Sequence, residues 1–173
     1  MTVPLLIHLV TLSLFMGLLL SAAIGDLKRY RIPNSYSISL VALYPLFVLS
    51  APYAVSPLVS LSIMAAVLVL SIVAFALRWI GGGDAKLLAA AALFAGPAMI
   101  IEFLVVTALA GGMLSVVMLS RSLRVSLAST LDHVGNHTLR DAMRADVIPY
   151  GVAIAAGGVF LALRLVAAAA NPA

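Results

Sequence analysis

The sequence predicts an all-α membrane protein, a bundle of about six transmembrane helices. Two observations support this prediction. The 173 residues are 64% hydrophobic and only 9% charged, whereas soluble domains are about 25% charged. The apolar residues also gather in runs long enough to enter or cross a hydrocarbon core that is about 30 Å thick. The excess apolar surface is therefore expected to face lipid, and the length of the chain indicates one domain, residues 1–173.

Six apolar runs are predicted as membrane segments, at residues 3–24, 36–51, 57–79, 85–95, 98–119 and 148–169. The first has no basic residues before it and exceeds the usual hydrophobic region of a cleavable signal, so it is interpreted as a helix. The fourth is short: a helix from Asp84 to Ala95 extends about 18 Å. It is expected either to span a thinned bilayer or to start within the protein at membrane depth. Gly96-Pro97 is predicted to break the chain between the fourth and fifth runs.

The basic residues lie on one side of this predicted topology. Nine of the ten lysines and arginines stand in or beside residues 25–35, 80–86 and 120–147, and only Arg164 does not. Basic residues favour cytoplasmic connections. These three connections are therefore predicted to be cytoplasmic, with both termini on the other side. The net charge of +4 follows from this sidedness, so no nucleic acid partner is expected.

Cysteine and histidine usage limits the chemistry. The chain has no cysteine, which excludes disulfides, thiolate nucleophiles and cysteine-bound zinc. His8, His133 and His137 are too scattered to predict a metal site, and no cofactor is expected. Among the acidic residues, Asp132, Asp141 and Asp146 are interpreted as solvated charges of the polar stretch 120–147. Glu102 is interpreted as an interfacial or packing-satisfied carboxylate.

Asp26 and Asp84 have different settings, because the predicted topology brings both to the cytoplasmic membrane face. Asp26 ends the first apolar run, and Asp84 follows three glycines at the start of the fourth. Two carboxylates in a partly dry site repel each other and share one proton. One can then accept a proton from water while the other donates to a peptide carbonyl or leaving amine. The alternative is that Asp84 is a helix N-cap and Asp26 a juxtamembrane anchor.

Three motifs in order resemble one protein family. Residues 26–34, an Asp followed by Ile-Pro-Asn, look like the first motif of bacterial type IV prepilin peptidases. Residues 81–87, Gly-Gly-Gly-Asp-Ala-Lys-Leu, look like their Gly-x-Gly-Asp motif with a following Lys. Residues 149–157, Pro-Tyr-Gly-Val-Ala-Ile-Ala-Ala-Gly, resemble the start of the last helix in the small, peptidase-only members that serve Flp/Tad pili. The resemblance extends from residue 26 to residue 157.

The resemblance implies an aspartic endopeptidase, a hydrolase that removes the short basic leader from prepilins at the cytoplasmic face of the bacterial inner membrane. Members cut typically after a glycine and need no metal or cofactor. The implied partners are the prepilin leader and its hydrophobic helix, together with the lipid bilayer. Asp26 and Asp84 match the catalytic pair. The matching residues with an implied positioning role are Gly81, Gly83, Lys86, Ile32, Pro33 and Asn34.

Some matching residues also have simpler interpretations. Lys86 is equally well explained as a cytoplasmic topology anchor. Pro33 fixes its own φ and favours an extended Ile32, after which Asn34 or Ser35 is expected to cap the second helix. Tyr150 and Gly151 are interpreted as packing and interface residues. Larger family members carry a cysteine-containing domain linked to N-methylation of the pilin, and no N-methyltransferase domain is expected in this chain.

Two other functions stay open on the sequence. Membrane carboxylates also serve as relays in small proton- or cation-coupled transporters, which predicts acidic residues near the bilayer midplane and internal symmetry. A non-catalytic assembly subunit predicts that the carboxylates of Asp26 and Asp84 lie far apart. Carboxylates within about one water molecule of each other would favour catalysis.

Overall fold

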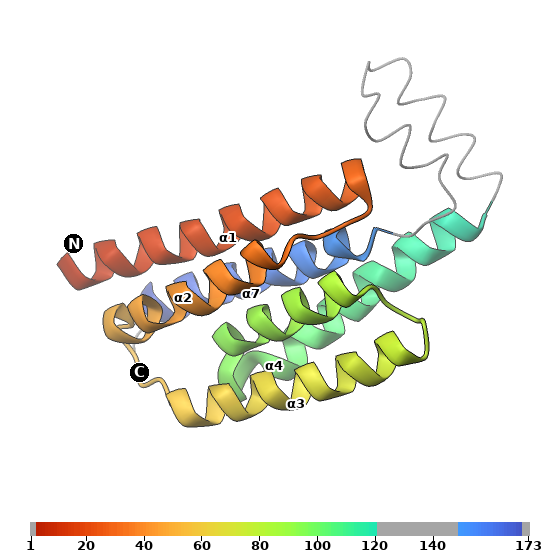
Figure 1. Ribbon diagram of the computed structural model, residues 1–173. Coiled ribbons are helices and arrows are strands. Elements are labelled where there is room, and N and C mark those ends of the chain that lie inside the picture. The colour runs from red at the N-terminus through yellow and green to blue at the C-terminus, as the bar shows by residue number, and fades with distance from the viewer. Residues whose placement is uncertain (1–2, 121–148, 171–173) are drawn as a thin grey trace, which may run out of the picture.

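The computed structural model describes residues 3–120 and 149–170, and these residues form five α-helices and no strand (Figure 1). The helices are α1 (Val3–Arg29), α2 (Asn34–Ser50), α3 (Pro57–Ala76), α4 (Gly82–Leu119) and α7 (Tyr150–Ala170). All except the 17-residue α2 are long and apolar enough to cross a membrane. The predicted all-helical membrane fold is confirmed, whereas the number of about six crossings stays a prediction. Residues 121–148, with the predicted solvated aspartates, lie outside the described residues.

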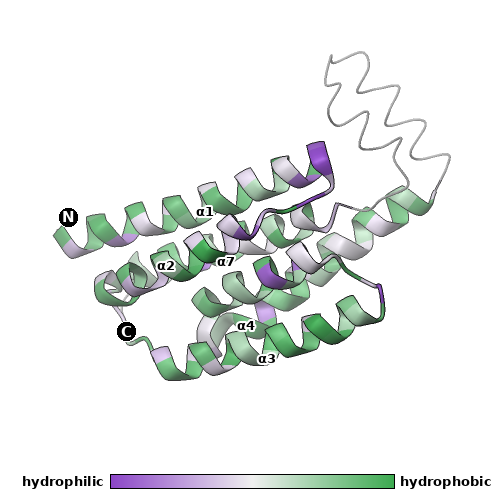
Figure 2. Ribbon diagram, in the orientation of Figure 1, coloured by the Kyte–Doolittle hydropathy of each residue, from purple (hydrophilic) through white to green (hydrophobic). Residues whose placement is uncertain are grey.

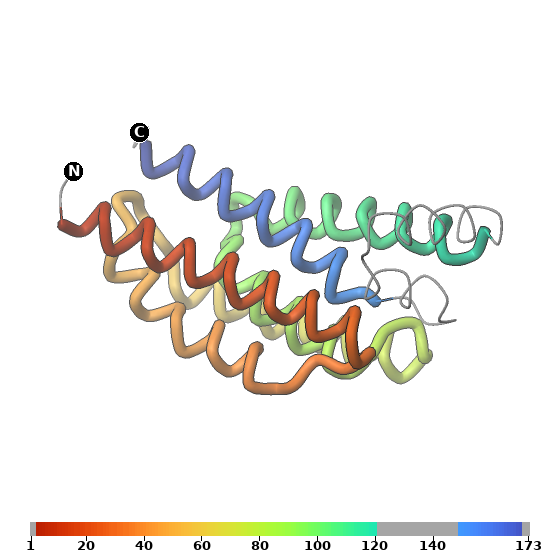
Figure 3. Tube along the Cα trace, turned by 90° about the horizontal axis from the view of Figure 1, so that it is seen from above, coloured from red at the N-terminus to blue at the C-terminus, as the bar shows by residue number. Residues whose placement is uncertain are grey.

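The predicted break at Gly96-Pro97 divides α4 into two arms. Gly96 has φ 55° and ψ −171°, a backbone conformation that glycine adopts without the steric cost of a β-carbon. Figures 1 and 3 show the chain doubling back at this point, so that residues 82–95 and 97–119 run along the bundle in opposite directions. The fourth and fifth predicted segments are therefore these two arms. The first arm, from Gly82 to residue 95, extends only about 21 Å.

The short first arm of α4 lies in the core of the bundle. Every residue from Ala89 to Ala95 is buried. The run of alanines at 89–92 lets neighbouring backbones approach closely, as small side chains do between membrane helices. At its end, the Phe94 ring packs 4.5 Å from the ring of Phe15 in α1 and 5.1 Å from that of Phe47 in α2, measured between centroids.

Two polar clusters lie away from the predicted site. His8 is fully buried, with Nδ1 3.4 Å from the Ser50 hydroxyl and Nε2 3.1 Å from the Tyr53 hydroxyl, so it links α1 to the end of α2 and the segment beyond it. Glu102 pairs with Arg164 of α7, whose Nε lies 3.2 Å from Oε2. The one basic residue outside the three predicted cytoplasmic connections therefore has a carboxylate partner.

The two ends of the bundle differ in polarity. Figure 2 shows hydrophilic residues at the end where α1 stops and where α2 and α4 begin. The first and last described residues, Val3 and Ala170, lie together at the opposite end (Figures 1 and 3). The end of α1 and the starts of α2 and α4 thus bring segments far apart in the sequence to one polar end.

Close packing of α7 on α4 generates a stability prediction. A β-carbon at Gly157 would collide with the Thr107 side chain and lie 3.2 Å from the Phe103 carbonyl oxygen. We expect Gly157→Val to lower the free energy of unfolding by about 1–3 kcal/mol through overpacking, measured by SDS titration of the purified protein. Gly17→Val is the control, because a β-carbon at Gly17 meets no atom within 4 Å. Equal stability of the two variants would contradict this packing.

Candidate active site

A cavity of about 440 Å³ lies at the polar end of the bundle. It is formed by the last turn of α1, the segment between α1 and α2, and the start of α4. Its lining contains every residue that the sequence singled out as a candidate catalytic or positioning residue. These residues are Asp26, Ile32, Pro33, Asn34, Gly81, Gly83, Asp84 and Lys86, and Tyr30, Arg31, Phe75 and Gly82 complete the lining.

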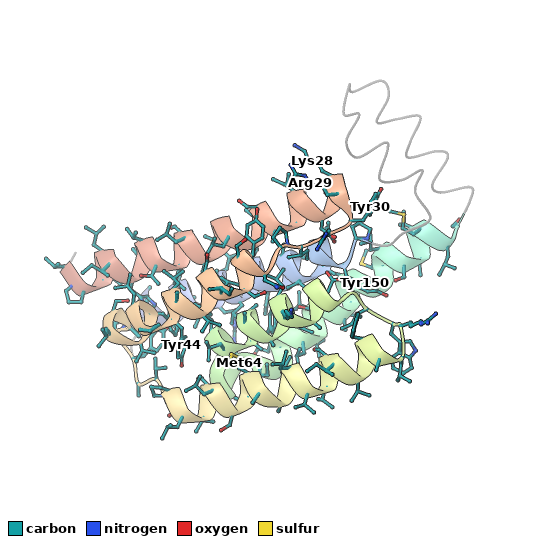
Figure 4. The ribbon with its side chains drawn as sticks, in the orientation of Figure 1. Lys28, Arg29, Tyr30, Tyr44, Met64 and Tyr150 are labelled. Carbon is teal, nitrogen blue, oxygen red and sulfur yellow. The ribbon has the colours of Figure 1, made fainter. Side chains whose placement is uncertain are left out.

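Asp26 lies in the last turn of α1 and is only 5% exposed. Its Oδ2 accepts a hydrogen bond from the backbone N–H of Gly151, at 2.9 Å. Gly151 belongs to the first turn of α7, where backbone N–H groups have no partner within their own helix. The start of α7 therefore fixes one oxygen of Asp26. In Figure 4, the labelled Tyr150 at the start of α7 lies at the same end of the bundle as Lys28 and Arg29 in the last turn of α1.

Gly151 has a role that the sequence interpretation missed. A β-carbon at this position would lie 2.9 Å from Oδ2 of Asp26 and 3.0 Å from Cδ1 of Ile32. Only glycine therefore allows α7 to approach Asp26 this closely. A glycine directly after Pro149-Tyr150 at the predicted start of a helix was the available signal, but the partner across the bundle was not visible in the sequence.

Asp84 is held differently. It is the third residue of α4, and its Oδ2 lies 3.2 Å from the Gly81 nitrogen, whose N–H donates to it. The N-cap position is Gly81, so the alternative interpretation of Asp84 as the N-cap residue is wrong, although its side chain does satisfy a backbone donor at the helix start. Its Oδ1 is buried and has no hydrogen-bond partner within the described part of the chain. One oxygen thus positions the side chain, and the other is not engaged.

The structure brings the two carboxylates together at one cavity. Asp26 and Asp84 both line it, Asp26 from the last turn of α1 and Asp84 from the first turn of α4. Carboxylates that lie side by side disfavour each other's negative charge, which is why such pairs can share one proton. The predicted topology placed both residues at one end of the bundle, and the cavity that they line is at one end.

The Ile-Pro-Asn segment packs directly on the glycine run. Tyr30 follows α1 with φ 50° and turns the chain, after which Ile32 is buried. A β-carbon at Gly83 would lie 2.8 Å from the Ile32 carbonyl oxygen and 3.0 Å from its Cβ. Ile32 therefore contacts the glycine positions of both α4 and α7, Gly83 and Gly151, and sets how these helix starts lie beside Asp26.

Lys86 and Asn34 form a second link between α4 and α2. The Lys86 ammonium donates to Oδ1 of Asn34 at 3.0 Å. The expected capping of α2 by Asn34 or Ser35 is wrong: Pro33 occupies the N-cap position, with φ −61° and ψ 144°, and no side chain caps the helix. The amide of Asn34 is used by Lys86 instead. Pro33 does precede α2 in an extended conformation, as its fixed φ favours.

Within residues 3–120 and 149–170, no group of three or more histidine and acidic side chains is placed to hold a metal ion.

The candidate site is a pair of aspartates in a cavity at one end of an all-helical membrane protein. A model of the type IV leader peptidase family matches residues 13–116, more than half of the chain, and the matched range includes both aspartates. The chain therefore belongs to the type IV leader peptidase family, and it is a membrane peptidase of the class that acts on prepilins. Comparisons with curated proteins and with solved structures each find no match.

The contact between Gly151 and Asp26 predicts that prepilin cleavage is sensitive to substitution of Gly151. Gly151→Ala keeps the backbone donor but places a methyl group against the Asp26 carboxylate and Ile32. We expect prepilin cleavage to fall by about tenfold to a hundredfold, because displacements of an ångström at a reacting group have effects of this size. The control is Gly25→Ala, next to Asp26 in the sequence, where a β-carbon meets nothing within 4 Å. Parental activity in Gly151→Ala would contradict the constraint.

The link between Lys86 and Asn34 predicts a smaller effect. We expect Lys86→Met and Asn34→Leu each to lower cleavage by no more than about fivefold, because exposure to solvent reduces the contribution of this charged hydrogen bond to about 1 kcal/mol or less. The double variant should be no slower than the slower single variant, since both changes remove the same contact. Additive losses in this double-mutant cycle would show that the two residues act separately.

Proposed function

We propose that this peptidase is an aspartic endopeptidase in which Asp26 and Asp84 are the catalytic residues. The observation that supports the proposal most is their placement at one cavity, each fixed through one oxygen by a backbone N–H, from Gly151 and Gly81 respectively. Backbone donors hold the side chains without supplying a counter-charge. The unengaged Oδ1 of Asp84 leaves an acceptor for water or a peptide group.

The proposed reaction is a hydrolysis by water, without a covalent intermediate. The ionised carboxylate of the pair removes a proton from a water molecule, whose oxygen attacks the carbonyl carbon of the scissile bond. The protonated carboxyl donates a hydrogen bond to the carbonyl oxygen during this attack. The carboxyl that took the proton from water then transfers it to the nitrogen of the leaving amine, and the C–N bond breaks. The products are the leader with a new carboxyl end and the pilin with a new amino end. The glycines at 81–83 let the side chains of Asp84 and Phe75 and the Ile32 backbone pack closely at the start of α4.

The proposed site of action is the cytoplasmic face of the bacterial inner membrane. Lys28 and Arg29 lie in the last turn of α1, and Arg31 and Lys86 line the cavity itself. Basic residues beside membrane helices favour the cytoplasmic side. The aspartates then face the cytoplasm, and both ends of the described chain lie toward the periplasm, in agreement with their position at the opposite end of the bundle.

The proposed substrates are Flp/Tad-type prepilins. This assignment rests on the resemblance of residues 149–157 to the small, peptidase-only branch of the family, and the contact between Gly151 and Asp26 gives that segment a place at the site. The hydrophobic helix of the prepilin would lie in the bilayer beside the bundle. Its cleavage site would be unwound, because a peptide bond within a helix is poorly exposed to attack.

Asp26→Asn and Asp84→Asn test the catalytic assignment. Each variant keeps the shape of the side chain but removes the proton chemistry, so we expect each to lower the cleavage rate by about a hundredfold to ten-thousandfold. The measurement is co-expression with a Flp-type prepilin and quantification of cleaved and uncleaved forms by gel mobility. Equal abundance of the variants in the membrane is the control for folding.

Unchanged cleavage in either variant would remove that residue from the mechanism. Loss of cleavage in Asp26→Asn and Asp84→Asn, with Gly25→Ala remaining active, would show that not every substitution near the end of α1 abolishes cleavage. A protein that cleaves no prepilin but moves protons across vesicles in an Asp84-dependent manner would instead be a transporter.

A further inference from the structure

A second cavity meets the first at Asp84. It has a volume of about 450 Å³ and lies between the two arms of α4 and the start of α7. This volume is within the range of about 300–1,000 Å³ that ligand pockets have. Asp84 is the one residue that lines both cavities. The two cavities differ in charge, because four charged side chains line the first and only Asp84 is charged in the second. The rest of the second lining is apolar or glycine except for Thr107, Ser115 and Tyr150.

The wall of this second cavity on α4 is a stripe of small residues. Ala108, Gly111, Gly112 and Ser115 recur three or four positions apart and therefore share one face of the helix. Small residues at this spacing let another chain approach closely within a membrane. The hydroxyl of Ser115 donates to the Gly111 carbonyl oxygen at 2.7 Å. Its donor is therefore satisfied within the helix and needs no hydrogen bond from an apolar group in the cavity.

The two glycines of the stripe have different surroundings. A β-carbon at Gly111 would lie 3.5 Å from Ala153 and from the Tyr150 ring, so this position packs on α7. A β-carbon at Gly112 would meet no atom within 4 Å. Gly112 is exposed and lines the cavity, so a side chain added there would meet none of the described residues.

We propose that this second cavity receives the apolar residues that directly follow the scissile bond of the prepilin, while the polar cavity receives the leader side. The proposal rests on the proposed function. It assigns the orientation of the substrate chain at Asp84, with the leader in the polar cavity and the residues after the cleaved bond in the apolar cavity. A prepilin changes from a polar leader to an apolar helix at the cleavage site, and the site changes from a polar to an apolar cavity at the same carboxylate. Gly112 is then a residue that determines which side chains are accepted after the bond.

A third cavity is a less suitable place for these residues. It has a volume of about 520 Å³, lies between α2, α3 and the first arm of α4, and is lined by neither aspartate. An extended chain advances at most about 3.6 Å per residue. The first residue after a bond held at Asp84 must therefore lie beside Asp84, which the second cavity adjoins and the third does not. Ala42 lines the third cavity and offers a matched control.

The test is steady-state cleavage by the full-length protein in detergent. The substrates are a Flp-type prepilin with leucine directly after the cleaved bond and the same prepilin with alanine there. Gly112→Leu adds a side chain into the open space, and leucine favours a helix more than glycine does. We expect this variant to raise KM for the leucine substrate by at least about tenfold and for the alanine substrate by less than about threefold. The kcat of both should change little.

Gly17→Leu and Ala42→Leu are the controls, and we expect both to keep the parental KM for both substrates. The proposal is overturned if Gly112→Leu behaves as the parental protein does, if it raises KM equally for the two substrates, or if Ala42→Leu produces the selective effect instead. Asp84→Asn separates this inference from the proposed function. Cleavage that depends on Asp84 but ignores Gly112→Leu refutes the substrate direction alone, whereas cleavage that survives Asp84→Asn refutes the catalytic assignment.

Discussion

The first turn of α7 reaches the carboxylate of Asp26 across the bundle, and the rest of the site depends on this approach. The Gly151 N–H donates to Oδ2 of a residue 125 positions earlier in the chain. Hydrogen bonds to charged groups contribute about 1.5–3 kcal/mol, but the bond also fixes geometry. Ile32 fills the space between α7 and α4, with Gly151 on one side and Gly83 on the other. A side chain at either glycine would collide with Ile32, and one at Gly151 would also collide with Asp26.

This arrangement reconciles two requirements that oppose each other. A carboxylate inside a membrane protein is costly unless it is hydrogen-bonded or protonated, yet a group that is fully satisfied has no capacity left for chemistry. Each aspartate here is held by a backbone N–H through Oδ2, and Oδ1 of Asp84 has no partner within the described residues. The helix starts supply donors that their own helices do not use. The break at Gly96 also matters, because it allows a short first arm that ends in the core and begins at the cavity.

Much of this arrangement was predictable from the sequence. Runs of apolar residues located the described helices, although α1 continues to Arg29, five residues beyond the predicted end of the first run. Gly96-Pro97 located the break, because length and glycine or proline chemistry are local properties. The polar end followed from the positions of lysine and arginine, and the residues of the three motifs placed Asp26 and Asp84 together. The capping of α2 was predicted incorrectly, since Asn34 is used by Lys86, 52 positions later in the chain. The contact of Gly151 with Asp26 and the apolar cavity beside Asp84 arise only from packing between distant helices, which no local pattern encodes.

Proximity of the two aspartate side chains in the membrane is the central claim, and cross-linking tests it directly. The chain has no cysteine, so Asp26→Cys with Asp84→Cys creates the only thiol pair. We predict that a bis-methanethiosulfonate reagent with a single methylene spacer joins peptides 26 and 84 in native membranes, detected by mass spectrometry. The same reagent should not join Asp26→Cys to Glu102→Cys on the second arm of α4. Labelling of both cysteines at 26 and 84 without a cross-link between them, or equal cross-linking of the control pair, would contradict the account.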